Sequence, residues 1–191
     1  MSPVDPIRPL AMPTRPAPEE TPAPERVSDY RLLLILAASI FVIDQLSKEW
    51  IAARLPFPTY GPPDAIPVIS GFFYLIHVGN TGAAWSMFAG QSLVLGAVAA
   101  LTLGGIFYWR KALGLRARFV QICFGLLCGG ILGNLVDRFR HQHVVDFLDF
   151  HFGSYVYPTF NIADCGICVG VVLFLWHSLR EPKADAPRRS R

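Results

Sequence analysis

The chain has 191 residues, of which 52% are hydrophobic and only 16% are charged. Soluble domains average about 25% charged residues, so this chain carries too little charge for an ordinary soluble surface, and its mean hydropathy is +0.39. The formal net charge is only +3, and no basic stripe runs through the body of the chain, which excludes a nucleic-acid-binding protein. The apolar content also excludes disorder for the body. An integral membrane protein with several spans is the expected class.

The two ends of the chain differ from the body in composition. Residues 1–29 contain eight prolines among Ala, Glu, Thr and Ser and show no hydrophobic periodicity. They predict a disordered tail that favours the polyproline II conformation. Residues 181–191 form a second tail with four basic and two acidic residues. The membrane domain is therefore expected over residues 30–180.

Four apolar stretches follow the first tail, and each has the length of a membrane span. They cover about residues 31–53, 92–109, 119–136 and 160–179, enough to cross about 30 Å of hydrocarbon. A cleaved signal peptide is the alternative for the first stretch, but its apolar pattern continues to Leu55 and no good small-residue cleavage site follows. In the third stretch, Gly125, Gly129 and Gly133 recur every four residues and predict a close approach between helices.

The distribution of Lys and Arg predicts how the chain lies in the membrane. The link over residues 110–118 contains four basic residues, whereas the segment 56–91 contains none. By the positive-inside rule, both termini and the 110–118 link face the cytoplasm, and the two longer links face outward.

The outward segments carry structure of their own. Ile66–Val78 is rich in β-branched and aromatic residues and predicts one or two short strands with a turn at Ser70-Gly71. Val144–Phe152 is apolar enough to dip into the membrane interface. The predicted fold is thus an all-α integral membrane protein: a four-transmembrane-helix bundle with a small outward-facing β-strand subdomain and a short interfacial helix.

Polar side chains from three spans lie at one predicted depth, near the outer surface. Ionisable groups inside spans are costly and mark functional sites by default. Asp146, on the link between the third and fourth spans, falls beside this layer. The layer itself contains Asp44, Lys48, Asn134, Asp137, Arg138, Asn161 and Asp164.

An Asn-x-x-Asp pattern occurs twice in this layer, at residues 134–137 and 161–164. The spacing puts the amide and the carboxylate on one helical face, where the Asn can donate to the carboxylate and hold it in place. Hydrogen bonding between helices, without a catalytic role, is the alternative interpretation.

Paired carboxylates suit the chemistry of this layer best. The layer holds no plausible Ser/His couple, and a metal site at His141, His143 and His151 is disfavoured because Arg138 and Arg140 lie beside the first two. The Cys165-Gly-Ile-Cys168 pattern is better explained by apolar packing. Two close Asp side chains share one proton, so one can activate water while the other polarises a carbonyl. From the pattern alone, Asp137 rivals Asp146 as a member of the pair.

Five motifs in order resemble those of the lipoprotein signal peptidases, also called signal peptidase II, over about residues 30–180. They are Asp44-Gln-Leu-Ser-Lys48, Asn80-Thr-Gly-Ala-Ala-Trp85, Gly129-Gly-Ile-Leu-Gly-Asn-Leu-Val-Asp-Arg138, Val144-Val-Asp-Phe147 and Phe160-Asn-Ile-Ala-Asp164. One such motif is weak, whereas five in register are highly specific.

The resemblance implies an activity and a set of roles. It implies a membrane aspartic endopeptidase that cleaves diacylglyceryl-modified prolipoproteins just before the lipidated Cys, with Asp146 and Asp164 as the catalytic pair and no metal or organic cofactor. Asp137 and Arg138 are then expected to form a supporting ion pair. The other expected supporting or substrate-binding residues are Asp44, Lys48, Asn80, Gly82, Asn134 and Asn161.

The expected partners are the prolipoprotein and membrane lipid, with no nucleic acid, and the expected state is a monomer in the bacterial inner membrane. Two other functions stay open at this point. One is a small ion-coupled transporter, since intramembrane Asp and Lys also mark proton relays; against it, the inner half of each span is apolar. The other is a non-catalytic factor that binds lipoprotein precursors.

Overall fold

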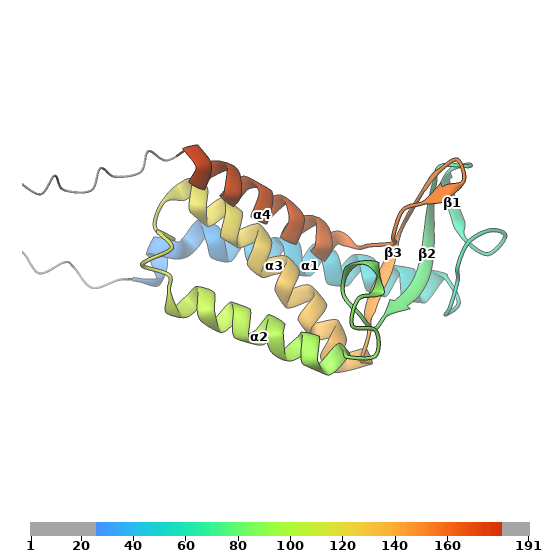
Figure 1. Ribbon diagram of the computed structural model, residues 1–191, viewed down its shortest axis with the longest axis horizontal. Coiled ribbons are helices and arrows are strands. Elements are labelled where there is room, and N and C mark those ends of the chain that lie inside the picture. The colour runs from blue at the N-terminus through green and yellow to red at the C-terminus, as the bar shows by residue number, and fades with distance from the viewer. Residues whose placement is uncertain (1–25, 181–191) are drawn as a thin grey trace, which may run out of the picture.

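A computed structural model describes residues 26–180, and its main feature is a bundle of four helices with a small sheet at one end (Figure 1). The predicted tails lie outside the described residues, apart from residues 26–29, which lead into and begin a 3-10 turn, η1 (Val27–Tyr30). The four helices are α1 (Arg31–Arg54), α2 (Ser92–Tyr108), α3 (Arg118–His141) and α4 (Ile162–Arg180).

The helices begin within two residues of the four predicted spans, but α3 runs five residues beyond its predicted end, to His141. The prediction stopped before Asp137 because charge is costly in a span; in the structure this side chain is buried against other helices. By length and composition, α3 and α4 could cross a membrane, while α2 is apolar but shorter. Four crossings therefore remain a prediction.

Helix α3 packs against each of the other three helices, and its glycines make this possible. A β-carbon on Gly129 would lie 2.6 Å from the Ala37 carbonyl oxygen of α1, and one on Gly133 would clash with the Asp44 carboxylate. The predicted close approach at these glycines is confirmed. The result is that polar groups of α1 and α3 reach hydrogen-bonding distance.

The sheet has four antiparallel strands in the order β1-β2-β3-β4. The prediction of strands around a Ser70-Gly71 turn is confirmed, and Gly71 has a positive φ of 79°, which glycine adopts without strain. The strands are β1 (Ile66–Ile69), β2 (Phe73–Asn80), β3 (Val144–Phe152) and β4 (Tyr155–Val156).

Val144–Phe152, which was expected only to dip into the membrane interface, is strand β3. No helix is described between α3 and α4, so the expected short interfacial helix does not lie in this link. The backbone of β3 pairs with β2, with Val78 opposite Asp146 and a register shift between Leu75 and Val78. A nine-residue apolar run does not distinguish helix from strand by itself, and the partner strand lies far away in the sequence. The assignment matters because β3 carries Asp146, so the pairing of β3 with β2 sets the position of this side chain.

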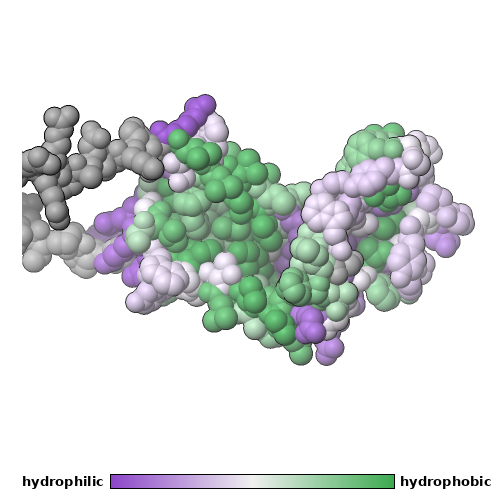
Figure 2. Space-filling view, viewed as in Figure 1, coloured by the Kyte–Doolittle hydropathy of each residue, from purple (hydrophilic) through white to green (hydrophobic). Residues whose placement is uncertain are grey.

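Apolar side chains cover the outside of the bundle. Figure 2 shows a largely hydrophobic surface over the helices and a mixed surface over the sheet. The exposed apolar side chains include Leu46, Val98, Leu101, Phe107, Val172 and Leu179. An apolar exterior of this extent suits hydrocarbon better than water.

Candidate active site

A cavity of about 860 Å³ lies between the sheet, the loop around η2 (Ala84–Ser86), and helices α3 and α4. Asp146 from β3 and Asp164 from α4 both line it, together with Asn80, Asn134 and Arg138. Residues that are up to 84 positions apart in the sequence therefore meet at one site. The sequence placed Asn134, Arg138 and Asp164 at one depth with Asp146 beside them, and the fold brings these residues to one cavity.

Two amide side chains hold the carboxyl group of Asp146. Asn161 Nδ2 donates to Asp146 Oδ1 at 2.7 Å, and Asn80 Nδ2 donates to Oδ2 at 3.0 Å. Asp146 is 2% exposed. Burial and, next, the charge of Asp164 raise the pKa of Asp146 to about 7, because both disfavour a second buried negative charge.

Asp164 is positioned by the start of its own helix. Asn161 Oδ1 accepts from the Asp164 backbone N–H at 3.0 Å, and Asp164 Oδ2 accepts from the Asn161 backbone N–H at 3.2 Å. This reciprocal pair is a capping box, formed by the residue before α4 and the third residue of α4. Asn134 Nδ2 donates to the other oxygen, Asp164 Oδ1, at 2.7 Å.

The two Asn-x-x-Asp patterns therefore work differently from the prediction. Each Asn side chain donates to a carboxylate outside its own pattern: Asn134 to Asp164 on α4, and Asn161 to Asp146 on β3. Within residues 161–164 the bonds run between side chain and backbone. Asn161 touches both acids and is completely buried, so it links the two halves of the pair.

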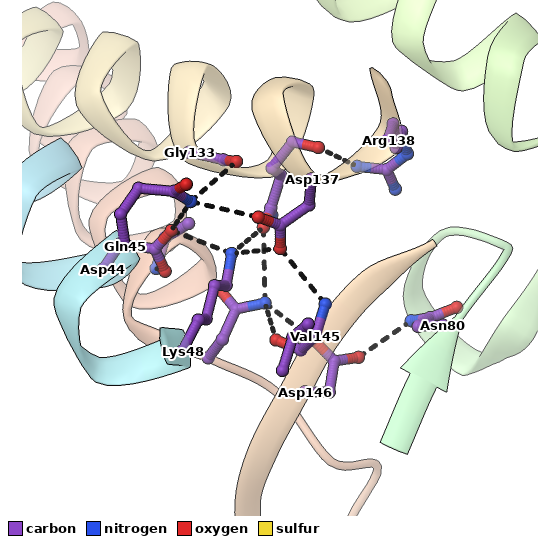
Figure 3. A network of polar contacts seen from close by, with 12 residues as sticks. Asp44, Gln45, Lys48, Asn80, Gly133, Asp137, Arg138, Val145 and Asp146 are labelled. Atoms are coloured by element: carbon purple, nitrogen blue, oxygen red, sulfur yellow. Dashed lines mark hydrogen bonds and ion pairs between the residues drawn. The ribbon is translucent and has the colours of Figure 1, made fainter. Parts of the chain in front are cut away.

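A buried cation, Lys48 of α1, organises the residues behind the pair (Figure 3). Its Nζ lies 2.8 Å from Asp44 Oδ2, 2.8 Å from Asp137 Oδ2 and 3.0 Å from Asn134 Oδ1. Because Asn134 Oδ1 accepts from Lys48, its Nδ2 must point to Asp164. Asp44 Oδ1 also accepts from the Ala163 N–H at 2.9 Å, which ties α1 to the first turn of α4.

Asp137, the rival candidate for the pair, lies in this supporting cluster. Its Oδ2 accepts from the Val145 backbone N–H at 3.1 Å, which holds the start of β3 beside Asp146. The expected ion pair between Asp137 and Arg138 is wrong, because Asp137 makes its close ion pair with Lys48. Neighbouring residues on a helix point in different directions, so the partner comes from α1 instead.

Arg138, Asn80 and Gly82 form one side of the cavity. Arg138 Nη2 donates to the Gly82 carbonyl oxygen at 3.0 Å, and Nη1 donates to the Asn134 carbonyl at 3.2 Å. Asn80 Oδ1 accepts from the Gly82 N–H at 2.9 Å. Arg138 Nε is buried without a partner among the described residues. The arginine thus fastens the loop after β2 to α3 and presents a cation to the cavity.

The histidines that raised the metal hypothesis have other neighbours. His143 stacks on Phe57 with ring centroids 5.3 Å apart, and His151 Nε2 lies 2.6 Å from Asp149 Oδ2. Within the described part of the chain, no group of three or more His, Cys, Asp or Glu side chains is arranged to hold a metal ion.

Sequence reasoning missed two polar residues at the site. Gln45 Nε2 donates to Asp137 Oδ1 at 3.0 Å and to Asp44 Oδ2 at 3.2 Å. Asp149 is 3% exposed and lines the cavity. Gln45 stands inside the first motif, and Asp149 is the next acid after Asp146 on the same apolar segment. Their positions in the sequence could therefore have predicted that both belong to the site.

The arrangement can support hydrolysis by two carboxyl groups. A buried pair that shares one proton offers both a base for water and a donor for a carbonyl oxygen. Its amide partners are neutral, so they orient the carboxyls without adding a full positive charge.

Comparison with known proteins identifies the family. The model of the family described as signal peptidase (SPase) II matches residues 36–180. A lipoprotein signal peptidase of Bacillus pumilus is 38% identical over 149 residues, covering 78% of this chain and 93% of that protein. One of Thermosynechococcus vestitus is 42% identical over 134 residues, covering 70% of this chain and 82% of that protein.

A solved structure agrees with the sequence relatives. A bacterial membrane enzyme has 28% sequence identity and a TM-score of 0.71, and the match covers 83% of this chain and 94% of that chain. The family match covers all five motifs and every residue of the site described above. With its fold, its site and its relatives in agreement, the chain belongs to the signal peptidase II family.

Proposed function

We propose that this chain removes signal peptides from prolipoproteins by aspartic-type catalysis, with Asp146 and Asp164 as the catalytic pair. Membership in the signal peptidase II family and relatives named lipoprotein signal peptidases support the prolipoprotein substrate. One observation carries the chemistry: both acids line one cavity, and a single buried amide, Asn161, contacts both. Asp137 has no comparable place, because Lys48 and the Val145 N–H occupy its carboxylate.

In the proposed reaction, Asp164 is the base and Asp146 carries the shared proton. The raised pKa of Asp146, about 7, lets this carboxyl hold a proton up to near-neutral pH, and the partial positive charge at the start of α4 stabilises a carboxylate in its first turn. Asp164 takes a proton from water as the water oxygen bonds to the scissile carbonyl carbon. Protonated Asp146 gives its proton to the carbonyl oxygen, so that a tetrahedral diol forms.

The tetrahedral diol then breaks down without a covalent link to the enzyme. The C–N bond breaks, and the nitrogen takes the proton held by Asp164 and leaves as an amine. One hydroxyl of the diol returns its proton to Asp146 as the carbonyl re-forms, which gives a carboxylic acid. One water is consumed, and both carboxyl groups return to their starting states. The released amine is the new N-terminus of the lipidated Cys.

The remaining site residues act through this pair. Lys48 orients Asn134, which orients Asp164, while Asp44 and Asp137 balance the charge of Lys48. Arg138 and Gly82 hold the loop that carries Asn80 in contact with Asp146. Of these, Asn80, Gly82, Asn134 and Arg138 line the cavity and can also contact the peptide.

The membrane placement is part of the proposal. The substrate carries diacylglycerol on its Cys, and its acyl chains stay in lipid against the apolar exterior of the bundle. The four helices cross the bacterial inner membrane, both termini and the 110–118 link are cytoplasmic, and the cavity opens near the outer face. The absence of Lys and Arg from residues 56–91 supports this orientation. The enzyme acts as a monomer.

The transporter alternative is not favoured, because the family and the relatives are peptidases. A non-catalytic precursor-binding factor predicts binding without release of a signal peptide, and the same experiment decides between that factor and an enzyme.

The deciding experiment replaces each catalytic acid by its amide. Asp146→Asn and Asp164→Asn, purified and tested by gel shift on a diacylated prolipoprotein, should each lose about 100- to 10,000-fold in turnover. Asp64→Asn, which changes an exposed acid outside the cavity, is the matched control and should keep normal turnover. Near-normal turnover in either catalytic variant contradicts the assigned pair.

A further inference from the structure

A second cavity, of about 690 Å³, lies at the end of the bundle opposite the sheet, where α1 begins and the α2–α3 link passes (Figure 1). No residue of the proposed active site lines it. Its lining includes three arginines, one acid and two apolar side chains: Arg31, Arg116, Arg118, Asp29, Leu32 and Ile35.

The charge of this cavity is unbalanced. Its one acid, Asp29, is matched by Arg116, whose Nη2 lies 2.5 Å from Asp29 Oδ2. The other two arginines, Arg31 and Arg118, are exposed. Within residues 26–180, their side chains make no hydrogen bond or ion pair. Two guanidinium groups therefore face the cavity without a counter-charge from the described chain.

A buried glutamine holds the walls of the cavity together. Gln121, which is 5% exposed, accepts the Leu33 N–H on Oε1 at 3.2 Å. Its Nε2 donates to the carbonyl oxygens of Asp29 at 2.8 Å and Arg116 at 3.2 Å. One side chain thus joins α3, the start of α1 and the α2–α3 link. Because the backbones next to Arg31 and Arg118 are joined in this way, both arginines stay on the walls of one cavity.

The cavity also has an apolar side that continues onto the outside of the bundle. Leu32 and Ile35 line it, and Ile35 with its neighbour Leu34 is about half exposed on the outer surface of α1. A ligand that fits both sides needs an anionic group and a hydrocarbon chain. A free anion would leave the apolar side unused.

We propose that this cavity binds an anionic phospholipid, with its phosphate between Arg31 and Arg118 and an acyl chain along Ile35. Guanidinium groups bind phosphate through paired hydrogen bonds, and basic pockets at helix ends are suited to acidic headgroups. The site is separate from catalysis, because it lies at the far end of α1 and α3 from the catalytic pair.

The test uses the full chain in bilayer nanodiscs with equal amounts of phosphatidylglycerol and phosphatidylcholine, followed by native mass spectrometry of retained lipid. The wild type should retain phosphatidylglycerol preferentially. Arg31→Gln combined with Arg118→Gln should weaken that retention about 30-fold, given the usual contribution of each basic residue. Arg31→Lys with Arg118→Lys keeps the charge but loses the paired hydrogen bonds, so its retention should lie between those of the wild type and the Gln variant.

The matched control is Arg110→Gln combined with Arg180→Gln, which removes the same charge from the same end of the bundle but outside the cavity lining. This control should retain lipid like the wild type. The control and the Arg31→Gln, Arg118→Gln variant should both cleave prolipoprotein normally, which shows that they fold. An equal loss in the control overturns the proposal, because binding would then follow overall surface charge.

A second arm distinguishes a lipid from a free anion. Thermal midpoints are measured in detergent with short-chain phosphatidylglycerol or with inorganic phosphate at the same concentration. Only the lipid should raise the midpoint of the wild type, and neither ligand should raise that of the Arg31→Gln, Arg118→Gln variant. Equal protection by phosphate alone, or no preference for phosphatidylglycerol in the wild type, overturns the proposal.

Discussion

At the scale of single residues, neutral amides contact the carboxyls of the proposed catalytic pair, while the buried Lys48 contacts Asp44, Asp137 and Asn134. Asn80 and Asn161 donate to Asp146, and Asn134 donates to Asp164. Lys48 is joined to the pair through Asn134, and through the Val145 and Ala163 N–H groups that its partners Asp137 and Asp44 accept from. A lysine in direct contact would favour two ionised carboxylates, whereas amides orient the pair and let it keep the one proton that the proposed reaction needs.

This arrangement predicts a bell-shaped dependence of kcat/KM on pH. The proposed reaction needs Asp146 protonated, and burial with the charge of Asp164 raises the pKa of Asp146 to about 7. Activity should therefore fall as pH rises through about 7, and it should fall again in acid, where Asp164 takes up a proton. Rates on a diacylated prolipoprotein from about pH 4 to about pH 9 measure both limbs.

The Asn80→Ala variant tests which group produces the alkaline limb. The Asn80 hydrogen bond lowers the pKa of Asp146, because it stabilises the charged form. Its removal should raise that pKa further, so the alkaline limb should move to higher pH while the maximal rate falls. If the alkaline limb stays at the same pH, the ionisation that produces it belongs to a group other than Asp146.

Lys48→Met should destabilise the fold as well as slow catalysis. The substitution leaves two buried carboxylates, Asp44 and Asp137, without their shared cation, a change that costs about 3–5 kcal/mol in other proteins. The thermal midpoint in detergent measures the loss. Lys111→Met, at an exposed position, is the control, and equal midpoints for the two variants would show that the buried cluster contributes nothing.

The sequence predicted which residues gather at the site but not how they pair. Asp44, Lys48, Asn134 and Asp164 were expected at one depth because the spans set their heights, and all four lie in one network. The partners depend on how each helix is rotated about its axis. One sequence does not reveal that rotation, so Lys48 as the partner of Asp137 was found only in the fold.

At the scale of elements, α3 is the helix on which the site depends. It packs against α1, α2 and α4, and it contributes Asn134, Asp137 and Arg138 to the polar network. Its glycines let α1 approach closely enough for Lys48 to reach both Asn134 and Asp137. A wider spacing of the two helices would separate this cation from its partners.

Gly129→Ala should therefore destabilise the bundle. The added β-carbon would meet the Ala37 carbonyl oxygen at 2.6 Å and Ile40 Cβ at 2.8 Å, and overpacking of this kind costs about 1–3 kcal/mol. Gly104→Ala on α2 is the control, because a β-carbon there meets nothing within 4 Å. The thermal midpoint should fall for the Gly129→Ala variant only. A similar fall in both variants would show that replacing glycine in these helices, and not the clash at Gly129, causes the loss of stability.

Elements defined by local pattern were predicted well, and the element defined by a distant partner was not. Continuous apolar length predicted the start of all four helices within two residues, because a span needs a minimum length. Val144–Phe152 lacks such a local signal, and β2, its pairing partner, ends 64 residues before it begins. The strand assignment depends on that long-range pairing.

At the scale of the whole molecule, the polar groups of the proposed catalytic site lie at the sheet end of the bundle, and the basic cavity lies at the opposite end. The outer surfaces of α1, α2 and α4 expose apolar side chains such as Leu46, Leu101 and Leu175, while the buried carboxylates lie where α1, α3, α4 and β3 meet. A substrate anchored in the bilayer would thus meet the cavity with its hydrocarbon still in lipid. This division of surfaces explains why a lipid on the substrate should matter.

Unmodified prolipoprotein should accordingly be a poor substrate. Acyl chains contribute about 0.8 kcal/mol per buried CH₂, and binding energy far from the scissile bond can offset the cost of ordering an extended peptide in the cavity. Removing the diacylglyceryl group should lower kcat/KM by several orders of magnitude, measured by gel shift on matched precursors in the same bilayer. The signal helix alone already anchors both precursors, so equal rates would mean that the acyl chains do not help to place the peptide between Asp146 and Asp164.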